Sequence, residues 1–519
     1  MDTLVNLFSW LITPWLPLAL LVGMGILLLP WRVRHIPHFT RGGVLLATGI
    51  VWFWVVAFGF SPIPLVHTLT LRGPLDMSIT LLLRLDKGHW LFTFLAATAA
   101  FAGSFLLPPR LPAGRTPGPS TALFLLAGTL LTTMAGNLLT LLLGWAITNA
   151  AYLGVLLSGG ARATWRTVGL VLLSGILLWA VLAAAPPAMA IRPWDETRFP
   201  AWALAFMGGS VWLYLGAYPF HRQHRLAAPG IPAPWLWLDV MAGASWAWRW
   251  ATLEGASQVW HHPAWIALAL FAAFGSALAS WLSESPRARL IWALIQRAGL
   301  LLLIPLLPEA WIYPSMIALS AAIVLAGGAL LILHTRHLAY GQNVAYLLAL
   351  ALFWGLPWTA GAPVRALIAT LWEQAPGLGL LLLISDALVL GSILSPPKWS
   401  GIARRREIIR VTLYVLPAIL VGYRMSEGIS LPPATWLWTV GIPLVLGGLL
   451  AWQRPRVFVD MRNWAWGMRV MAHLQPWETG VREVIHWSLL ALGGMTTLIE
   501  GAGWAAWLLF AAFIYILLH

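Results

Sequence analysis

The chain has 519 residues, of which 60% are hydrophobic and only 9% are charged, and its formal net charge is +14. About a quarter of the residues of a soluble domain are charged, so this composition excludes a large soluble enzyme and indicates a polytopic membrane protein. The sequence contains no cysteine, which excludes disulfides, thiolate metal sites and cysteine nucleophiles.

Apolar runs long enough to cross a bilayer follow one another along the chain. A membrane-spanning helix needs roughly 17 to 25 mainly apolar residues, and candidates lie near 4–30, 43–60, 90–107, 119–135, 137–157, 167–187, 200–220, 235–255, 263–282, 290–307, 312–333, 343–371, 377–395, 408–423, 434–452 and 487–517. The first run lacks a basic leader and a small-residue cleavage site, so we expect no cleavable signal peptide. The sequence therefore predicts an all-α, polytopic integral membrane bundle of about 14–16 helices.

Basic residues alternate between the connections that join these helices. Counted in chain order, the odd-numbered connections hold 22 of the 31 Lys and Arg residues, the even-numbered connections hold six, and three fall within helices. Basic connections face the cytoplasm, so we expect a multi-pass protein with its N-terminus outside. The basic face explains the net charge, and no soluble basic domain remains that could bind nucleic acid. We expect the lipid bilayer to surround the predicted helices.

Residues 453–486 alternate apolar and charged groups and are too polar to span a membrane. Such a pattern is typical of an amphipathic segment that lies along a membrane surface. We expect this segment to run along the cytoplasmic face and to join the last two helices.

Two predicted helices contain residues that interrupt a helix. The seventh ends in LYLGAYPFHRQH, with Pro219, and the twelfth contains GLPWTAGAP, with Pro357 and Pro363. An interrupted helix is tolerated at membrane depth only where protein or water satisfies its backbone, and matching interruptions in two halves indicate inverted repeats. Because the interruptions lie five helices apart, we expect two inverted five-helix repeats. The predicted parts are 1–118 for helices 1–3, 119–255 for the first repeat, 256–395 for the second repeat and 396–519 for the C-terminal helices.

These motifs resemble those of a known family, the antiporter-like membrane subunits of respiratory complex I and of Mrp-type cation/proton antiporters. Pro219, Phe220 and His221 match the family's Pro-Phe-His stretch on a discontinuous helix 7. The stretch GLPWTAGAPVR, which ends at Arg365, resembles the family's motif on a broken helix 12, and LLLRLDKGHWLFTFL, with Asp86, resembles the start of helix 3. The similarity covers roughly residues 80–395, and the C-terminal plan most resembles the largest, distal subunit.

The resemblance implies a place in a prokaryotic plasma membrane, among other membrane subunits of a multi-subunit complex. Family members take part in proton translocation coupled to quinone reduction, as in NADH:quinone oxidoreductase, or in ion or inorganic-carbon uptake. The resemblance implies no redox cofactor in this chain, and no phosphate loop, dinucleotide fingerprint, haem motif or hydrolase triad stands out. The chain would therefore be a non-catalytic subunit.

The family's ionisable residues are replaced at several positions. The family places a glutamate on helix 5 directly after the Trp of a Gly-Trp step, where this chain has Ala146, and a lysine on helix 7, where it has Tyr214. The basic residue of helix 8 has no clear counterpart, with Trp246 or Arg249 nearest, and the His and Lys of helix 11 are missing. A buried lysine can release a proton, whereas arginine is not deprotonated in proteins. We therefore expect weak or absent proton pumping.

A few ionisable residues remain in apolar surroundings: Asp239, Arg249, Glu254, Asp386 and Glu500. Such groups are functional candidates, although Glu254 and Glu500 lie close enough to helix ends to be interface residues. Asp386 is the deepest, and the turn near EQAPG brings its helix antiparallel to that of Arg365 with an offset of about 4.5 Å. We predict that Arg365 and Asp386 meet inside the bundle, and a structural ion pair is favoured over a proton relay.

Four histidines fall on the predicted cytoplasmic side: His221, His224, His334 and His337. They could form a proton-entry antenna that titrates near neutrality. The favoured interpretation is solvated interface histidines, because no carboxylates lie nearby. The HRQH and HTRH spacings resemble metal-ligand spacings, but without Cys or flanking Asp or Glu no metal site is predicted.

Three functional hypotheses follow. The first is an antiporter-like subunit of a complex I-like or Mrp-like complex, or of an ion or inorganic-carbon uptake system, that has lost its own pumping residues. The second is a scaffold that only completes a membrane arm. The third, an unrelated transferase acting on lipid-linked sugars, would need an acidic pair in an early outward loop, and Asp76 and Asp86 in the 61–90 loop are not adjacent. We rank that hypothesis last.

Overall fold

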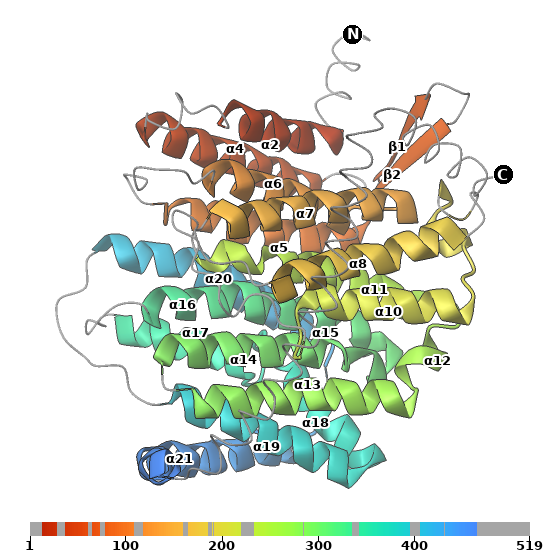
Figure 1. Cartoon of the computed structure of the whole chain (residues 1–519). Coiled ribbons are helices and arrows are strands. Elements are labelled where there is room, and N and C mark those ends of the chain that lie inside the picture. The colour runs from red at the N-terminus through yellow and green to blue at the C-terminus, as the bar shows by residue number, and fades with distance from the viewer. Residues whose placement is uncertain are drawn as a thin grey trace.

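The computed structural model describes residues 13–28, 37–60, 65–72, 78–107, 118–158, 165–184, 189, 191–219, 233–283, 285–334, 342–394, 405–429 and 431–463. Its helices run side by side in a bundle, with a hairpin of two strands at one end (Figure 1). Within the described residues, six helices are long and apolar enough to cross a membrane, and seven shorter apolar helices accompany them. The predicted all-α membrane bundle is therefore confirmed at this level.

The first half of the chain builds one side of the bundle. Its helices are α2 (Trp15–Leu27), α4 (Pro37–Phe58), α5 (Lys87–Ser104), α6 (Gly118–Thr133), α7 (Leu138–Ser158), α8 (Trp165–Ala184), α10 (Ala201–Leu215) and α11 (Leu238–Thr252). The short 3₁₀ helices η1 (Trp194–Glu196) and η3 (Ala233–Trp237) precede α10 and α11. These helices agree with the predicted ones to within a few residues, except that α2 begins later and α10 ends earlier.

The second half continues the bundle from α12 (Ser257–Trp260). Its elements are α13 (Pro263–Leu282), α14 (Pro286–Leu301), η4 (Ile304–Leu306), α15 (Glu309–Ala321), the π-helical turn η5 (Ala322–Ala326), α16 (Gly327–His334), α17 (Gln342–Trp354), α18 (Pro363–Gln374), α19 (Pro376–Ile393), α20 (Arg405–Ser426) and α21 (Pro433–Asn463). The predicted helix 343–371 is thus two helices, α17 and α18. The predicted surface segment does not begin at 453, because α21 continues without a break to Asn463. Residues 464–486 and the helix predicted over 487–517 lie outside the described residues.

The loop predicted over residues 61–90 is wrong in part, because it contains an antiparallel hairpin. Strands β1 (Leu65–Arg72) and β2 (Ser78–Leu85) pair in register from Leu65–Leu85 to Arg72–Ser78. Both strands are rich in Leu, Thr, Val and Ile, which favour a strand. The hairpin is tied to the bundle because the Gly136 amide donates to the Leu82 carbonyl over 2.7 Å.

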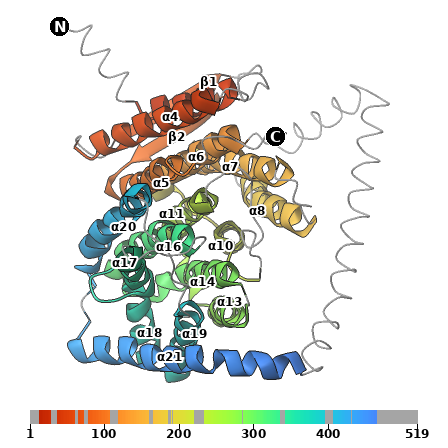
Figure 2. The ribbon, with the colours of Figure 1, turned by 90° about the vertical axis from the view of Figure 1, so that its left-hand side faces the viewer.

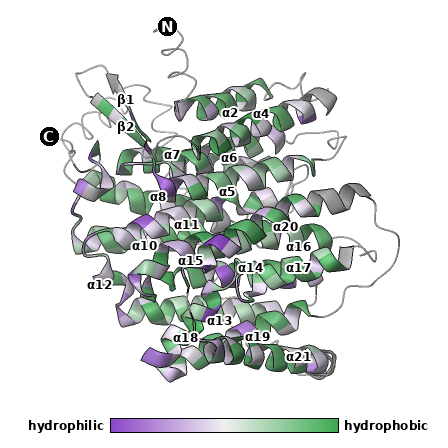
Figure 3. Cartoon of the chain, turned by 180° about the vertical axis from the view of Figure 1, so that it is seen from behind, coloured by the Kyte–Doolittle hydropathy of each residue, from purple (hydrophilic) through white to green (hydrophobic). Residues whose placement is uncertain are grey.

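The helices differ greatly in how far the bundle covers them. In the segment from α14 to η4, and in the segment from α15 to α16, 94% of the residues in the most apolar stretch of 18 residues are buried. The corresponding share is 39% in α4 and 17% in α21. Viewed along the helices, α14 and α16 lie inside the bundle, and α4 and α21 lie at opposite edges (Figure 2). Hydrophobic residues cover most of the helices (Figure 3), as expected for helices that bury one face in protein and expose another to lipid.

Helices α6 and α7 approach each other unusually closely. A Cβ added to Gly128 would lie 2.4 Å from the Thr148 hydroxyl and 2.6 Å from the Thr148 backbone nitrogen, and one on Gly144 would lie 2.7 Å from the Thr132 nitrogen. Small residues at such a contact let helix backbones approach, which is the usual basis of helix association in membranes. Gly128 and Gly144 therefore fix the packing of this pair.

We expect Gly128→Ala to lower the stability of the protein by about 1–3 kcal/mol, because the added methyl group would push the two backbones apart. The melting temperature of the purified protein in detergent measures this effect. Gly23→Ala on α2 is the matched control, since a Cβ there would meet nothing within 4 Å. Equal melting temperatures for the two variants would contradict the close packing of α6 on α7.

Candidate functional site

The interruption between α17 and α18 supplies unpaired backbone groups near the middle of the bundle. Helix α17 ends at Trp354, and Gly355 follows with a φ of 101°, a conformation that glycine adopts without strain. A Cβ at Gly355 would also lie 2.3 Å from the Gly361 carbonyl. The carbonyls at the end of a helix have no intrahelical partner, so Trp354 and Gly355 can accept hydrogen bonds from elsewhere.

Arg365, the third residue of α18, donates hydrogen bonds to these carbonyls. Its Nη2 donates to the Trp354 carbonyl over 2.7 Å, its Nε donates to the Gly355 carbonyl over 3.1 Å, and its Nη1 donates to the Thr439 carbonyl over 2.7 Å. The guanidinium also lies over the Trp354 ring, 4.8 Å from its centroid. Arg365 is fully buried and therefore joins α18, α17 and α21.

The Thr439 carbonyl is available because of a proline. Pro443 lies four residues further along α21, and proline has no N–H to donate to the carbonyl of residue i−4. Arg365 provides the missing donor. A proline within a spanning helix is tolerated where a neighbour satisfies the freed carbonyl, so Pro443 and Arg365 compensate for each other.

Asp386 lies between two arginines. Its Oδ2 is 2.7 Å from Nη2 of Arg365 and its Oδ1 is 2.8 Å from Nη2 of Arg297, on α14. Trp354 Nε1 also donates to Oδ2 over 2.9 Å. All three charged side chains are at most 1% exposed. The predicted contact between Arg365 and Asp386 is confirmed, and Arg297 is a third member that the sequence analysis did not pair with them.

Arg297 connects this triad to a second layer of polar groups. Its Nη1 donates to Gln296 Oε1 over 3.1 Å, Gln296 Nε2 donates to the Ser385 hydroxyl over 3.2 Å, and that hydroxyl donates to the Ala273 carbonyl over 3.2 Å. The Arg297 guanidinium lies 5.1 Å from the centroid of the Phe353 ring. The network therefore joins α13, α14, α17 and α19 at one level of the bundle.

Arg297 and Arg365 hold the Asp386 carboxylate between them, and we call this arrangement the clamp. Two guanidinium groups bind the carboxylate in its ionised form, and arginine does not release its proton in proteins. Removing one partner of a buried pair leaves the other charge uncompensated, which costs about 3–5 kcal/mol. No member of the triad is therefore suited to take up and release a proton.

The first half of the chain contains a buried aromatic pair between α7 and α10. The Trp145 ring, on α7, contacts the Tyr214 ring, on α10, edge to face at a centroid distance of 4.6 Å, and both side chains are buried. Ala146 is exposed at the bundle surface. Trp145 therefore faces Tyr214, whereas Ala146, the next residue, is exposed.

Arg249 and the start of α5 form a second polar cluster. Arg249 donates to the carbonyls of Thr132 and Thr133 in the last turn of α6, where a cation stabilises the helix end. Nearby, Nδ1 of buried His89 lies 2.5 Å from Oδ1 of Asp86. Burial would raise the pKa of the Asp86 carboxyl, but the hydrogen bonds and charge of His89 lower it below its usual range. Arg249 itself, through the Thr132 and Thr133 carbonyls, caps the C-terminal end of α6.

The remaining predicted residues take varied places. Glu254 forms an exposed pair with Arg198 at 2.7 Å, which fits an interface residue. Asp239 is buried in the first turn of α11. Trp246 packs against Trp194. Outside the described residues lie His221, His224, His337 and Glu500, and of His334 only the backbone is described.

Metal ligands do not gather in the part of the chain that the structure describes. No group of three or more His, Asp or Glu side chains there could hold a metal ion.

Comparisons with known proteins connect this geometry to a fold. No protein-family model matches the sequence, and no curated protein is similar to it. Three solved membrane complexes contain similar chains. The Mrp complex from Dietzia sp. DQ12-45-1b gives a TM-score of 0.69 at 17% identity over 91% of this chain. An archaeal respiratory complex, the membrane-bound sulfane sulfur reductase, gives a TM-score of 0.64 at 14% identity over 78% of this chain. Respiratory complex I from Thermus thermophilus with bound NADH gives a TM-score of 0.65 at 18% identity over 84% of this chain.

These similarities confirm, at the level of the fold, the predicted resemblance to the antiporter-like subunits. The chain spans 59% of the length of the Mrp-complex chain, 75% of the sulfane sulfur reductase chain and 99% of the complex I chain. Each similar chain is a subunit of a multi-subunit membrane complex.

Proposed function

We propose that this protein is a membrane subunit of a multi-subunit prokaryotic complex, with an antiporter-like fold but without a proton carrier of its own. The observation that carries the proposal is Asp386 held between Arg297 and Arg365. A carrier in such a fold needs a buried group that can lose and regain a proton, as lysine can. The groups that occupy the middle of the second half are instead fixed in their charged forms.

The first half supports the same proposal. A Trp–Tyr pair, Trp145 with Tyr214, fills the contact between α7 and α10. Neither ring offers a charge that could move a proton near neutral pH. The role we assign to the bundle is to complete a membrane arm and keep it closed to ions, with its charges serving as clamps.

The two interruptions support an inverted-repeat interpretation. Helix α10 ends at Leu215 and is followed by Gly216, with a φ of 62°, just before Pro219, and α17 ends at Trp354 and is followed by Gly355. We propose that α6–α11 and α13–α19 are the two repeats and that these interruptions correspond. Under this proposal Arg365 stabilises the second interruption, and the family's transport architecture is retained after its carriers have been replaced.

Co-purification tests the assembly. An affinity tag on the whole chain in its native membrane, extracted in mild detergent, should recover several other integral membrane proteins at a constant ratio. A chain that runs as a single species under those conditions, with full thermal stability, would contradict a role as a subunit.

The proposed topology places the N-terminus outside. Ser280 donates to the Arg289 carbonyl over 2.8 Å, and Arg289 Nη1 donates to the Ser392 carbonyl over 3.0 Å, so the end of α13, the start of α14 and the end of α19 share one side. Because the sequence has no cysteine, single cysteines can be labelled selectively. We expect Arg225→Cys and Arg404→Cys to react only after the membrane is permeabilised, and Thr70→Cys to react from outside. Labelling of residues 225 and 404 from opposite faces would overturn the topology.

A further inference from the structure

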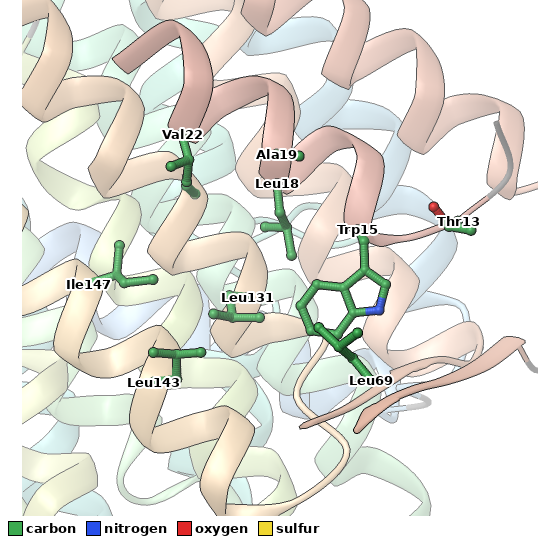
Figure 4. A pocket seen from close by; sticks show the side chains of 10 residues that line it. Thr13, Trp15, Leu18, Ala19, Val22, Leu69, Leu131, Leu143 and Ile147 are labelled. Atoms are coloured by element: carbon green, nitrogen blue, oxygen red, sulfur yellow. The ribbon is translucent and has the colours of Figure 1, made fainter. Parts of the chain in front are cut away.

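A hollow lies at the edge of the bundle where α2 and α7 both pack on α6 but scarcely on each other (Figure 4). Its volume is about 490 Å³. Helix α6 provides the floor and the other two helices provide the walls. The lining residues are Thr13, Trp15, Leu18, Ala19, Val22, Leu69, Ala127, Leu131, Leu143 and Ile147. The small side chains of Ala19 and Ala127 leave the space that larger residues would fill.

The hollow has an open mouth and a closed inner end. Leu69, on the hairpin, and Trp15, at the first residue of α2, mark the mouth. Deeper along the same helices, the Phe124 ring lies 3.0 Å from where a Cβ on Gly25 would stand, so the two helices meet there. Seven residues separate Trp15 from Val22, the deepest lining residue of α2, which is about 10 Å of helix.

This depth lies within one leaflet of a bilayer. The hydrocarbon core is about 30 Å thick, so one leaflet accounts for about 15 Å. The hydroxyl of Thr13 and the indole of Trp15 lie at the mouth, and every deeper lining residue is aliphatic. Tryptophan at the end of a spanning helix is typical of the level of the lipid headgroups.

We infer that the hollow is a binding site for one acyl chain of a phospholipid from the leaflet on the hairpin side. The chain enters beside Trp15, lies on Ala127 and ends near Val22 and Ile147, with the headgroup at the mouth. The wholly aliphatic interior offers no partners to a water molecule, which needs two to four. A helix from another subunit would need a groove along a whole spanning length, and the lining of this hollow stops at Val22 and Ile147.

Binding here depends on packing. Lipid tails are as apolar as the lining residues, so transfer from the bilayer into the hollow gains nothing from the hydrophobic effect. The gain comes from dispersion contacts on several sides of the chain, which an unfilled hollow would lose. A chain held this way should exchange more slowly than the lipids around the exposed faces of α4.

The test uses the whole chain reconstituted into phosphatidylglycerol vesicles that contain a phospholipid with a photoreactive diazirine near the end of one acyl chain. After irradiation the protein is washed in lipid-free detergent, its adducts are mapped, and native mass spectrometry counts the phospholipids that it retains. We expect one retained phospholipid and adducts at Val22 or Ile147. Adducts spread equally over α4 and the hollow would overturn the site.

Two variants make the test specific. Ala19→Trp fills the hollow and should reduce the retained phospholipid by about fivefold or more, whereas Leu46→Trp on α4, where Leu46 is 63% exposed, should leave it unchanged. Phe124→Ala makes room beyond Ala127 on α6 and should shift the preference towards longer acyl chains. Unchanged retention in Ala19→Trp would refute the inference, and so would an unchanged chain-length preference in Phe124→Ala.

Discussion

Asp386→Ala is expected to destabilise the protein more than any other single substitution in the triad, by about 3–5 kcal/mol. The carboxylate is the only anion between Arg297 and Arg365 in the described contacts of the triad. Its removal leaves two buried guanidinium groups facing each other without a counter-charge. It also leaves Trp354 Nε1 without the acceptor that it has in the native protein. The melting temperature in detergent, with size-exclusion profiles, measures the loss.

Combined substitutions separate the clamp from a simple loss of packing. Removing Arg365 together with Asp386, as Arg365→Leu, should be less damaging than Asp386→Ala alone, because one uncompensated charge disappears with its partner. Adding Arg297→Leu should recover still more stability, since apolar residues of similar volume can replace a buried ion cluster. If the loss in the double variant equals the sum of the losses in the two single variants, the charges do not interact and the clamp does not exist.

Arg365→Leu is the second change with a large expected effect, about 2–5 kcal/mol. It leaves Asp386 with one arginine and leaves the carbonyls of Gly355 and Thr439 without this donor, while the Trp354 carbonyl keeps only the longer hydrogen bond, 3.4 Å, from Nη2 of Arg297. Arg365→Lys should restore little, because an ammonium cannot reproduce the planar set of donors that reaches all these groups. Arg424→Leu is the matched control, since the Arg424 side chain is 76% exposed and pairs only with exposed Glu427 among the described contacts.

Pro443 gives this prediction an internal check. In the Arg365→Leu background, Pro443→Ala supplies an N–H that can pair with the Thr439 carbonyl within α21 and should therefore stabilise the protein. In the native background the same change makes that N–H compete with Arg365 for one carbonyl. The two effects should therefore not add. Equal effects of Pro443→Ala in both backgrounds would show that the Thr439 carbonyl does not matter to Arg365.

The contact between Arg365 and Asp386 could be predicted because both lie close to one tight turn. Their two helices are consecutive and antiparallel, so the distance of each residue from the turn fixes its depth. Arg297 could not be assigned in the same way, since α14 and α19 are separated by several helices and 89 residues divide Arg297 from Asp386. Sequence spacing carries no information on which non-consecutive helices pack together.

Other features of the structure could not be predicted from the sequence, for different physical reasons. The sequence does not show that Trp145, and not Ala146, faces Tyr214, because one residue turns a helix by about 100° and so exchanges an inward side chain for an outward one. The hairpin β1–β2 was missed because its short alternating strands stand outside the long apolar runs. The sequence does show Pro443 inside a helix and hence a free Thr439 carbonyl, but it does not show which donor takes it.

The most direct test of a bundle without a proton carrier is cation/proton exchange by the purified chain in liposomes. A pH-sensitive dye inside the vesicles reports proton movement after a sodium or potassium gradient is imposed, and an added ionophore shows that the vesicles respond. We expect no exchange above that of empty vesicles, because Asp386 is fixed by Arg297 and Arg365 and a Trp–Tyr pair occupies the first half. Saturable exchange that is lost in Asp386→Asn would contradict the account and would make Asp386 a carrier.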